Sequence, residues 1–208
     1  MVRSLFTQKG RSIFLLMAML LLTHSASAYA DKVTLNTFCS QLAGEWQGSA
    51  ANPNVYPKKV TTSVMCSADR RNLFISVSRG SRFTNSETWW FRQQNGHILL
   101  VYANGVTDDV SQELTLYEQA GRYSFLGKGE INQRPALVQL QFDPIIDDTD
   151  TDTDTDTDTD TSASADQAIL GWQWQQSAHY LDDDSEQYQV VRAISLLKPS
   201  AEETQLTE

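Results

Sequence analysis

Apolar and polar residues alternate in short runs along most of the chain after residue 43. Leu73, Ile75 and Val77 fall on one face of an extended segment, while Ser76 and Ser78 fall on the other. A period of two indicates a β-strand with one buried face. The pattern predicts ten strands, at 45–50, 60–66, 73–79, 87–93, 98–103, 113–118, 122–129, 136–142, 169–177 and 188–197.

Turn-forming residues separate these runs, whereas helical spacing is almost absent. Asn95-Gly96 and Asn104-Gly105 are typical of tight hairpin turns. One short helical turn is expected before the first strand, with Thr37 as its N-cap and Gly44 ending it. About ten short antiparallel strands predict an all-β domain, and periodicity alone leaves a sandwich and a closed barrel open.

The final strand carries a charge within its apolar face. Tyr188, Val190, Ile194 and Leu196 are expected to point inward together with Arg192. A charge among inward-facing apolar residues must be paired or must face a ligand.

Residues 1–30 have the layout of a secretory signal peptide. Arg3, Lys9 and Arg11 precede the apolar run 13–22, and small residues follow it up to Ala30. The run is too short to span a bilayer, which takes about 20 residues. We therefore expect an exported, soluble protein, periplasmic or secreted and without a stable membrane anchor, with one domain over residues 31–208.

Charge and cysteine content narrow the possible partners. The chain has 16 basic and 26 acidic residues, and three of the basic ones lie within residues 1–30. An acidic body argues against nucleic acid as a partner. Cys39 and Cys66 are the two cysteines, and an even pair in an exported chain predicts a disulfide rather than a metal site.

An Asp-Thr repeat occupies residues 147–161, between the predicted strands at 136–142 and 169–177. Neighbouring carboxylates repel each other and leave nothing apolar to bury, so a disordered loop is expected over residues 147–166. Weak, multivalent calcium binding is the functional alternative, since carboxylates are hard oxygen ligands.

A Gly-x-Trp motif opens the first strand. Gly44, Trp46 and Gly48, followed by Tyr56-Pro57, resemble the opening of lipocalin-like (calycin) barrels, nearest to the nitrobindin-like heme-binding group. The resemblance implies one up-and-down antiparallel barrel of about ten strands. It also implies that Trp46 plugs one end of the barrel while Gly44 lets the chain turn beneath it.

The same group binds heme through a histidine near the end of the chain. The last strand here, residues 188–197, contains no histidine, and His97 and His179 adjoin predicted turns. We therefore expect no heme and no other cofactor.

Several aromatic residues and two arginines could line a cavity or fill the core. Trp172 and Trp174 share one side of their strand, and Arg92 shares a face with Trp90. An inward arginine could hold a carboxylate or pair with a glutamate such as Glu45 or Glu130. The candidate ligand-binding residues are Trp90, Arg92, Tyr102, Tyr123, Trp172, Trp174 and Arg192.

Catalytic motifs are absent from the sequence: it has no Ser-His-Asp order, metal-binding HExxH or phosphate loop. The leading prediction is non-enzymatic binding of a small apolar or aromatic molecule. Two alternatives stay open. One is a cavity enzyme for a small aromatic acid, using Tyr102, Tyr123, Arg92 and Glu130. The other is an interaction module that binds glycans or proteins through exposed tryptophans.

Overall fold

The computed structural model describes residues 29–53, 55–79, 85–146, 168–184 and 187–199. Residues 1–28 of the predicted signal peptide (1–30) and the whole predicted loop at residues 147–166 lie outside these ranges. Within the part of the chain described, no helix is long and apolar enough to cross a membrane.

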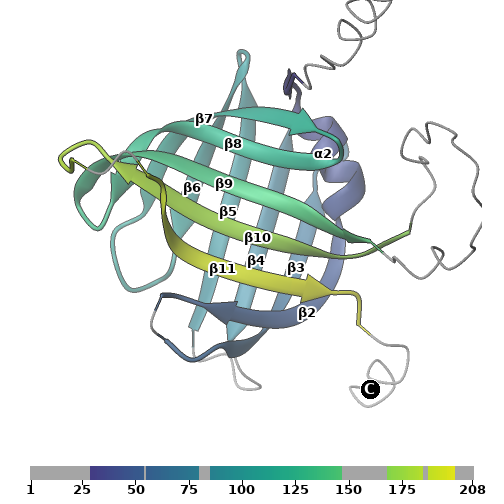
Figure 1. Ribbon diagram of the computed structural model, residues 1–208. Helices are drawn as coiled ribbons and strands as arrows, with labels where there is room; N and C mark the ends of the chain where they lie inside the picture. Colours follow the sequence, from purple (N-terminus) through teal and green to yellow (C-terminus); the bar gives the residue numbers. More distant parts are fainter. Residues whose placement is uncertain (1–28, 54, 80–84, 147–167, 185–186, 200–208) are drawn as a thin grey trace, which may run out of the picture.

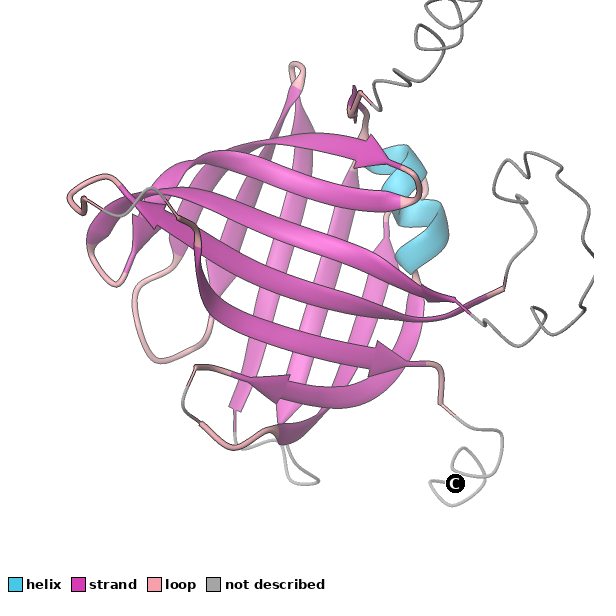
Figure 2. Cartoon of the chain, viewed as in Figure 1, coloured by secondary structure: helices cyan, strands magenta, loops and turns pink. Residues whose placement is uncertain are grey.

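Ten antiparallel strands form a closed barrel, as expected, and the ends of the strands lie within four residues of the predicted ones (Figures 1 and 2). Each strand pairs with the next along the chain, and the barrel closes where β11 pairs with β2. A two-residue strand, β1 (Asp31–Lys32), adds to β7. The barrel strands are β2 (Gly44–Ala51), β3 (Lys58–Cys66), β4 (Asn72–Arg79), β5 (Asn85–Gln94), β6 (His97–Ala103), β7 (Val110–Gln119), β8 (Arg122–Ile131), β9 (Arg134–Ile146), β10 (Ile169–Tyr180) and β11 (Gln189–Leu197).

The closing pair of strands depends on Gly48. Gly48 lies opposite Leu196, and a Cβ at this position would come within 1.7 Å of the carbonyl oxygen of Ser195. A side chain here would force β2 and β11 apart, so the motif glycine permits the close approach that closes the barrel.

A short helix, α2 (Leu35–Leu42), covers one end of the barrel (Figure 1). Its buried residues, Leu35, Phe38, Cys39 and Leu42, follow helical spacing. Thr34 is the N-cap, so the prediction that Thr37 caps the helix is wrong. Thr37 lies inside the helix, where its carbonyl oxygen accepts a hydrogen bond from Ser40 Oγ at 2.7 Å.

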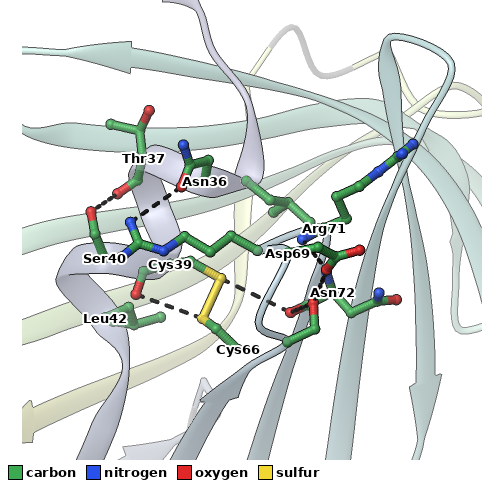
Figure 3. Close-up of a disulfide and its surroundings, with 12 residues drawn as sticks. Asn36, Thr37, Cys39, Ser40, Leu42, Cys66, Asp69, Arg71 and Asn72 are labelled. Atoms are coloured by element: carbon green, nitrogen blue, oxygen red, sulfur yellow. Dashed lines mark hydrogen bonds between the residues drawn. A yellow bond between two sulfur atoms is a disulfide. The ribbon is translucent and has the colours of Figure 1, made fainter.

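The predicted disulfide joins Cys39 on α2 to Cys66 at the end of β3 (Figure 3). Next to it, Trp46 is buried and its Nε1 donates a hydrogen bond to the carbonyl oxygen of Leu42 at 2.9 Å. The motif tryptophan therefore lies at the helix-covered end and ties the first strand to the helix.

The barrel interior differs between its two ends. At the helix-covered end Phe38 lies among aromatic rings, with its centroid 4.8 to 6.5 Å from those of Tyr123, Phe125, Phe142 and Trp172. Toward the opposite end the buried residues include Glu87, Gln112 and Gln176. Polar groups in a barrel interior need partners, so this second end is where a site is expected.

A β-bulge changes the inward face of the last strand. Gln176 pairs with Arg192, but the next residue of β10, Ser177, pairs with Val190, which leaves Val191 as the extra residue. Arg192, Ile194 and Leu196 keep the predicted inward face. Val190 and Tyr188 are each 43% exposed, so their predicted inward placement is wrong.

Candidate functional site

A cavity of about 790 Å³ opens at the end of the barrel opposite α2. Its rim comes from the β6–β7 loop and the β8–β9 turn, which Figure 1 shows at the far end from the helix. Its wall includes Trp89, Leu100 and Tyr102, which project inward from β5 and β6. The volume falls within the range of small-molecule sites.

Two aromatic rings form one wall of the cavity. The ring centroids of Trp89 and Tyr102 lie 4.6 Å apart at an interplanar angle of 53°. Trp89 also meets the edge of Trp174 at 4.7 Å and 80°. Trp174 in turn stacks on Phe142, so the cavity wall rests on the packed aromatic half of the barrel.

A three-residue ion-pair cluster crosses the barrel beside this wall. Glu87 on β5 accepts hydrogen bonds from Arg192 Nη1 and, at 2.5 Å, from Arg79 Nη2. The Arg192 guanidinium carbon lies 5.7 Å from the Trp89 ring centroid and 5.8 Å from that of Tyr102. Because two arginines share one carboxylate, the cluster keeps one positive charge in excess.

Three buried polar atoms on residues of the cavity wall have no hydrogen-bond partner among the described residues: Trp89 Nε1, Gln112 Oε1 and Arg192 Nε. The other end of the Gln112 amide donates to the carbonyl oxygen of Glu130 at 3.3 Å. The remaining buried atoms of this kind, Thr62 Oγ1 and the Nε1 atoms of Trp172 and Trp174, lie outside the cavity lining. Buried polar atoms are usually satisfied, so these three make the cavity the candidate site of the described chain.

The rim of the cavity is acidic. Asp108, Asp109 and Glu130 line it and are exposed, while Arg192 is the one positively charged residue among the described lining residues. The Asn104 side chain shapes the β6–β7 loop, since its Oδ1 accepts hydrogen bonds from the backbone N–H groups of Val106 and Thr107, each at 2.9 Å. This Asx turn holds the loop that carries the two aspartates.

A second, smaller hollow of about 430 Å³ lies on the outer surface, beside β7, β8 and β9. Tyr117, Arg122 and Gln141 line it. None of its described lining residues has a buried polar atom without a partner. The interior cavity is therefore the stronger candidate.

Of the residues predicted from sequence as ligand-binding, two line the cavity: Tyr102 and Arg192. The partner of Arg192 is Glu87, and neither Glu45 nor Glu130 is paired with it. Glu45 lies on the outside, where it accepts a hydrogen bond from Ser63 Oγ at 2.6 Å.

Trp90 and Arg92 lie on the outer wall, so the prediction that they point inward is wrong. Trp89 and Phe91 are the buried residues of this run. Trp90 stacks on Phe74 at 5.3 Å, and the Arg92 guanidinium carbon lies 4.5 Å from the Trp90 centroid. Three successive aromatic residues gave no alternation from which to read the inward face.

Tyr123, Trp172 and Trp174 point inward but belong to the packed half of the barrel rather than to the cavity lining. Trp172 and Trp174 are 0% and 1% exposed, so they are not available for surface contacts. Burial, with Glu118 nearby, raises the pKa of the Tyr123 hydroxyl above its usual value. The four residues considered for catalysis are thus separated: Arg92 is outside, Tyr123 is in the core, and Tyr102 and Glu130 line the cavity.

The two histidines of the described chain lie at strand positions that alternate with buried residues, and so face outward. His97 precedes buried Ile98 and lies 3.7 Å from Glu113, while His179 lies between buried Ala178 and Tyr180. Neither lines the cavity. The described residues contain no group of three or more His, Cys, Asp or Glu side chains suited to a metal ion. That the protein does not bind heme stays a prediction.

Together these features define a closed ten-stranded antiparallel β-barrel with a helix over one end and a polar, aromatic cavity at the other. No protein-family model matches the sequence, and no curated protein is significantly similar to it. Among solved structures, the chain is similar to the crystal structure of Rv2717c from M. tuberculosis. That similarity has a TM-score of 0.46 and 12% sequence identity, and it covers 82% of this chain and 100% of the other.

Proposed function

We propose that this protein is an exported member of the nitrobindin-like group of barrels. In this proposal it binds a small apolar or aromatic molecule in the cavity opposite α2, without converting it chemically. The observation that carries the proposal is the cavity wall, which combines the Trp89–Tyr102 ring pair with three buried polar atoms that have no partner among the described residues.

Aromatic rings at a cavity favour a flat or apolar ligand because contact removes their surface from water. The polar atoms would orient the ligand. A ligand that hydrogen-bonds to them removes the free-energy cost of burying them without a partner. A tightly packed hydrophobic core would have neither the open volume of this cavity nor its buried polar groups.

Export is supported by the signal-like segment in residues 1–30 and by the Cys39–Cys66 disulfide, since such bonds persist in oxidising compartments. Binding without catalysis is supported by the separation of Arg92 and Tyr123 from the cavity. N-terminal sequencing of the exported chain should find a first residue at Tyr29 or Asp31, and a start at Met1 would contradict export by cleavage.

Dye binding with two matched variants tests the binding proposal. Val191 lines the cavity, whereas Val101 lies on the outer wall next to buried Leu100. Nile red, a neutral dye, should bind the natural protein saturably. Val191→Trp should weaken binding at least tenfold by filling the cavity, and Val101→Trp should leave it unchanged. Absence of saturable binding, or equal loss in both variants, would contradict a ligand in the cavity.

A further inference from the structure

The cavity holds its charges in two separate layers. Inside the barrel, Arg79 and Arg192 share the single carboxylate of Glu87, so this layer carries one excess positive charge. At the rim, the charged lining residues are Asp108, Asp109 and Glu130, all of them acidic. The aromatic pair Trp89 and Tyr102 also contributes to the cavity wall.

Resting on the proposed function, we infer that the ligand is a flat aromatic molecule with opposite charges at its two ends. Its carboxylate binds Arg192, its ring lies against Trp89 and Tyr102, and its ammonium group faces the acidic rim.

The hydrogen bonds of Arg192 support the inner half of this inference. Its Nη1 donates to Glu87, while its Nε is buried and finds no acceptor in the described part of the chain. The edge of Arg134 formed by Nε and Nη2 binds a carboxylate elsewhere in this protein: its Nε donates to Asp182 Oδ2 at 3.1 Å and its Nη2 to Asp182 Oδ1 at 2.8 Å.

A carboxylate suits the inner end for two further reasons. It would neutralise the excess charge of the ion-pair cluster, and a buried charge is stable only when it is compensated. It can also accept from Trp89 Nε1, which is buried and is a donor only. A hydroxyl or amine elsewhere on the ligand could donate to Gln112 Oε1.

An aromatic molecule that carries only a negative charge matches the inner end of the cavity but not its acidic rim. The acidic residues at the opening repel a free anion and attract a cation, although solvent weakens both effects. A molecule that carries both charges at opposite ends satisfies the rim and Arg192 together.

The test uses four para-substituted benzenes of similar size that differ in which charged groups they carry. They are 4-(aminomethyl)benzoate, with both charges, 4-methylbenzoate, 4-methylbenzylamine and uncharged 4-methylbenzyl alcohol. Isothermal titration calorimetry on the natural protein should rank the two-charge probe tightest. It should bind more than tenfold tighter than the alcohol, since a charge-assisted hydrogen bond outweighs a neutral one.

Two variants locate the two ends of the ligand. Arg192→Gln should remove the advantage of both carboxylate probes over their uncharged or cationic counterparts. Asp108→Asn with Asp109→Asn, at exposed positions, should reduce only the advantage of the amine, by about two- to fivefold. The second variant needs no buried change, so it remains informative if Arg192→Gln fails to fold.

Each other outcome contradicts the inference in a distinguishable way. Equal affinity for all four probes would overturn the charge-based recognition and leave the proposed binding function intact. Equal affinity for 4-methylbenzoate and the two-charge probe would reject the role of the rim. An advantage of the carboxylate that persists in Arg192→Gln would reject the role of Arg192. No binding of any probe, together with no binding of Nile red, would overturn the proposed function itself.

Discussion

Arg192 and Glu87 form an ion pair inside the barrel although 105 residues separate them in the sequence. Arg192 lies on β11 and Glu87 on β5, and β2, β3 and β4 lie between them in the wall. The pair therefore spans the lumen. Both residues are largely buried, with side-chain exposures of 16% and 9%.

Glu87→Leu should destabilise the protein by about 3 kcal/mol, because it leaves Arg192 buried without its partner. The double variant Glu87→Leu with Arg192→Met should recover most of this loss, since it removes the buried charges and leaves only Arg79, whose side chain is 30% exposed to solvent. Urea unfolding measures both changes. Glu113→Gln is the matched control: its side chain is 73% exposed on the outer wall, so the expected loss is below about 0.5 kcal/mol. A loss for Glu87→Leu no larger than for this control would contradict a structural role for the pair.

The disulfide should contribute substantially to stability. Cys39 and Cys66 are 27 residues apart, and closing a loop of this length restricts the unfolded chain by about 3.5 kcal/mol in the entropy model. Replacing both by serine should lower the free energy of unfolding by about that amount. Thiol titration of the unfolded, unreduced natural protein should find no free thiol, and two free thiols would reject the bond.

The Asp-Thr tract should be dispensable for stability. β9 ends at Ile146 and β10 begins at Ile169, and these two residues are paired, so a short turn can join the strands. Replacing residues 147–161 by a Gly/Ser turn should change the free energy of unfolding by no more than about 1 kcal/mol. A loss of several kcal/mol, or a calcium-dependent rise in Tm that disappears with the tract, would show that the tract is structural.

Acid should weaken one ion pair at the open end of the barrel. The hydrogen bonds from Arg134 lower the pKa of Asp182 below its usual value of 3.8. The unfolded chain therefore takes up the proton at higher pH than the folded chain does. The stabilisation from this pair is complete above the unfolded pKa and is lost as the pH falls through the folded pKa.

Asp182→Asn should consequently be less stable than the natural protein near pH 6, and the difference should vanish near pH 2. Urea unfolding across that range measures it, with Asp184→Asn at a neighbouring exposed position as the control. A difference independent of pH would show that the carboxylate charge is not what Arg134 stabilises.

The ten strands could be predicted because most barrel strands bury one face. In β4, for example, the buried residues Leu73, Ile75 and Val77 recur at every second position of the sequence. The inward face of β5 could not be predicted, because Trp89, Trp90 and Phe91 are all apolar. The outward direction of Val190 could not be predicted either, because the bulge at Val191 shifts the alternation of β11.

The cavity depends on contacts between distant strands, which local patterns do not contain. Arg192 could be identified as an inward charge, but its partner Glu87 follows from the number of strands between them around the barrel. Gln112 and Gln176 are buried polar residues with an ordinary sequence context. Asp108 and Asp109 are adjacent acids without a distinctive motif, and their position at the rim follows from the closure of the barrel.

The binding proposal is tested most directly by native mass spectrometry of the protein taken from the cells that produce it naturally. We expect a bound small molecule on the mature chain, one per barrel, that is released on unfolding and is absent from the Val191→Trp variant. Val101→Trp should retain it. A natural protein that shows only the mass of the chain would contradict a ligand held in this cavity. So would a bound molecule that the Val191→Trp variant retains in full.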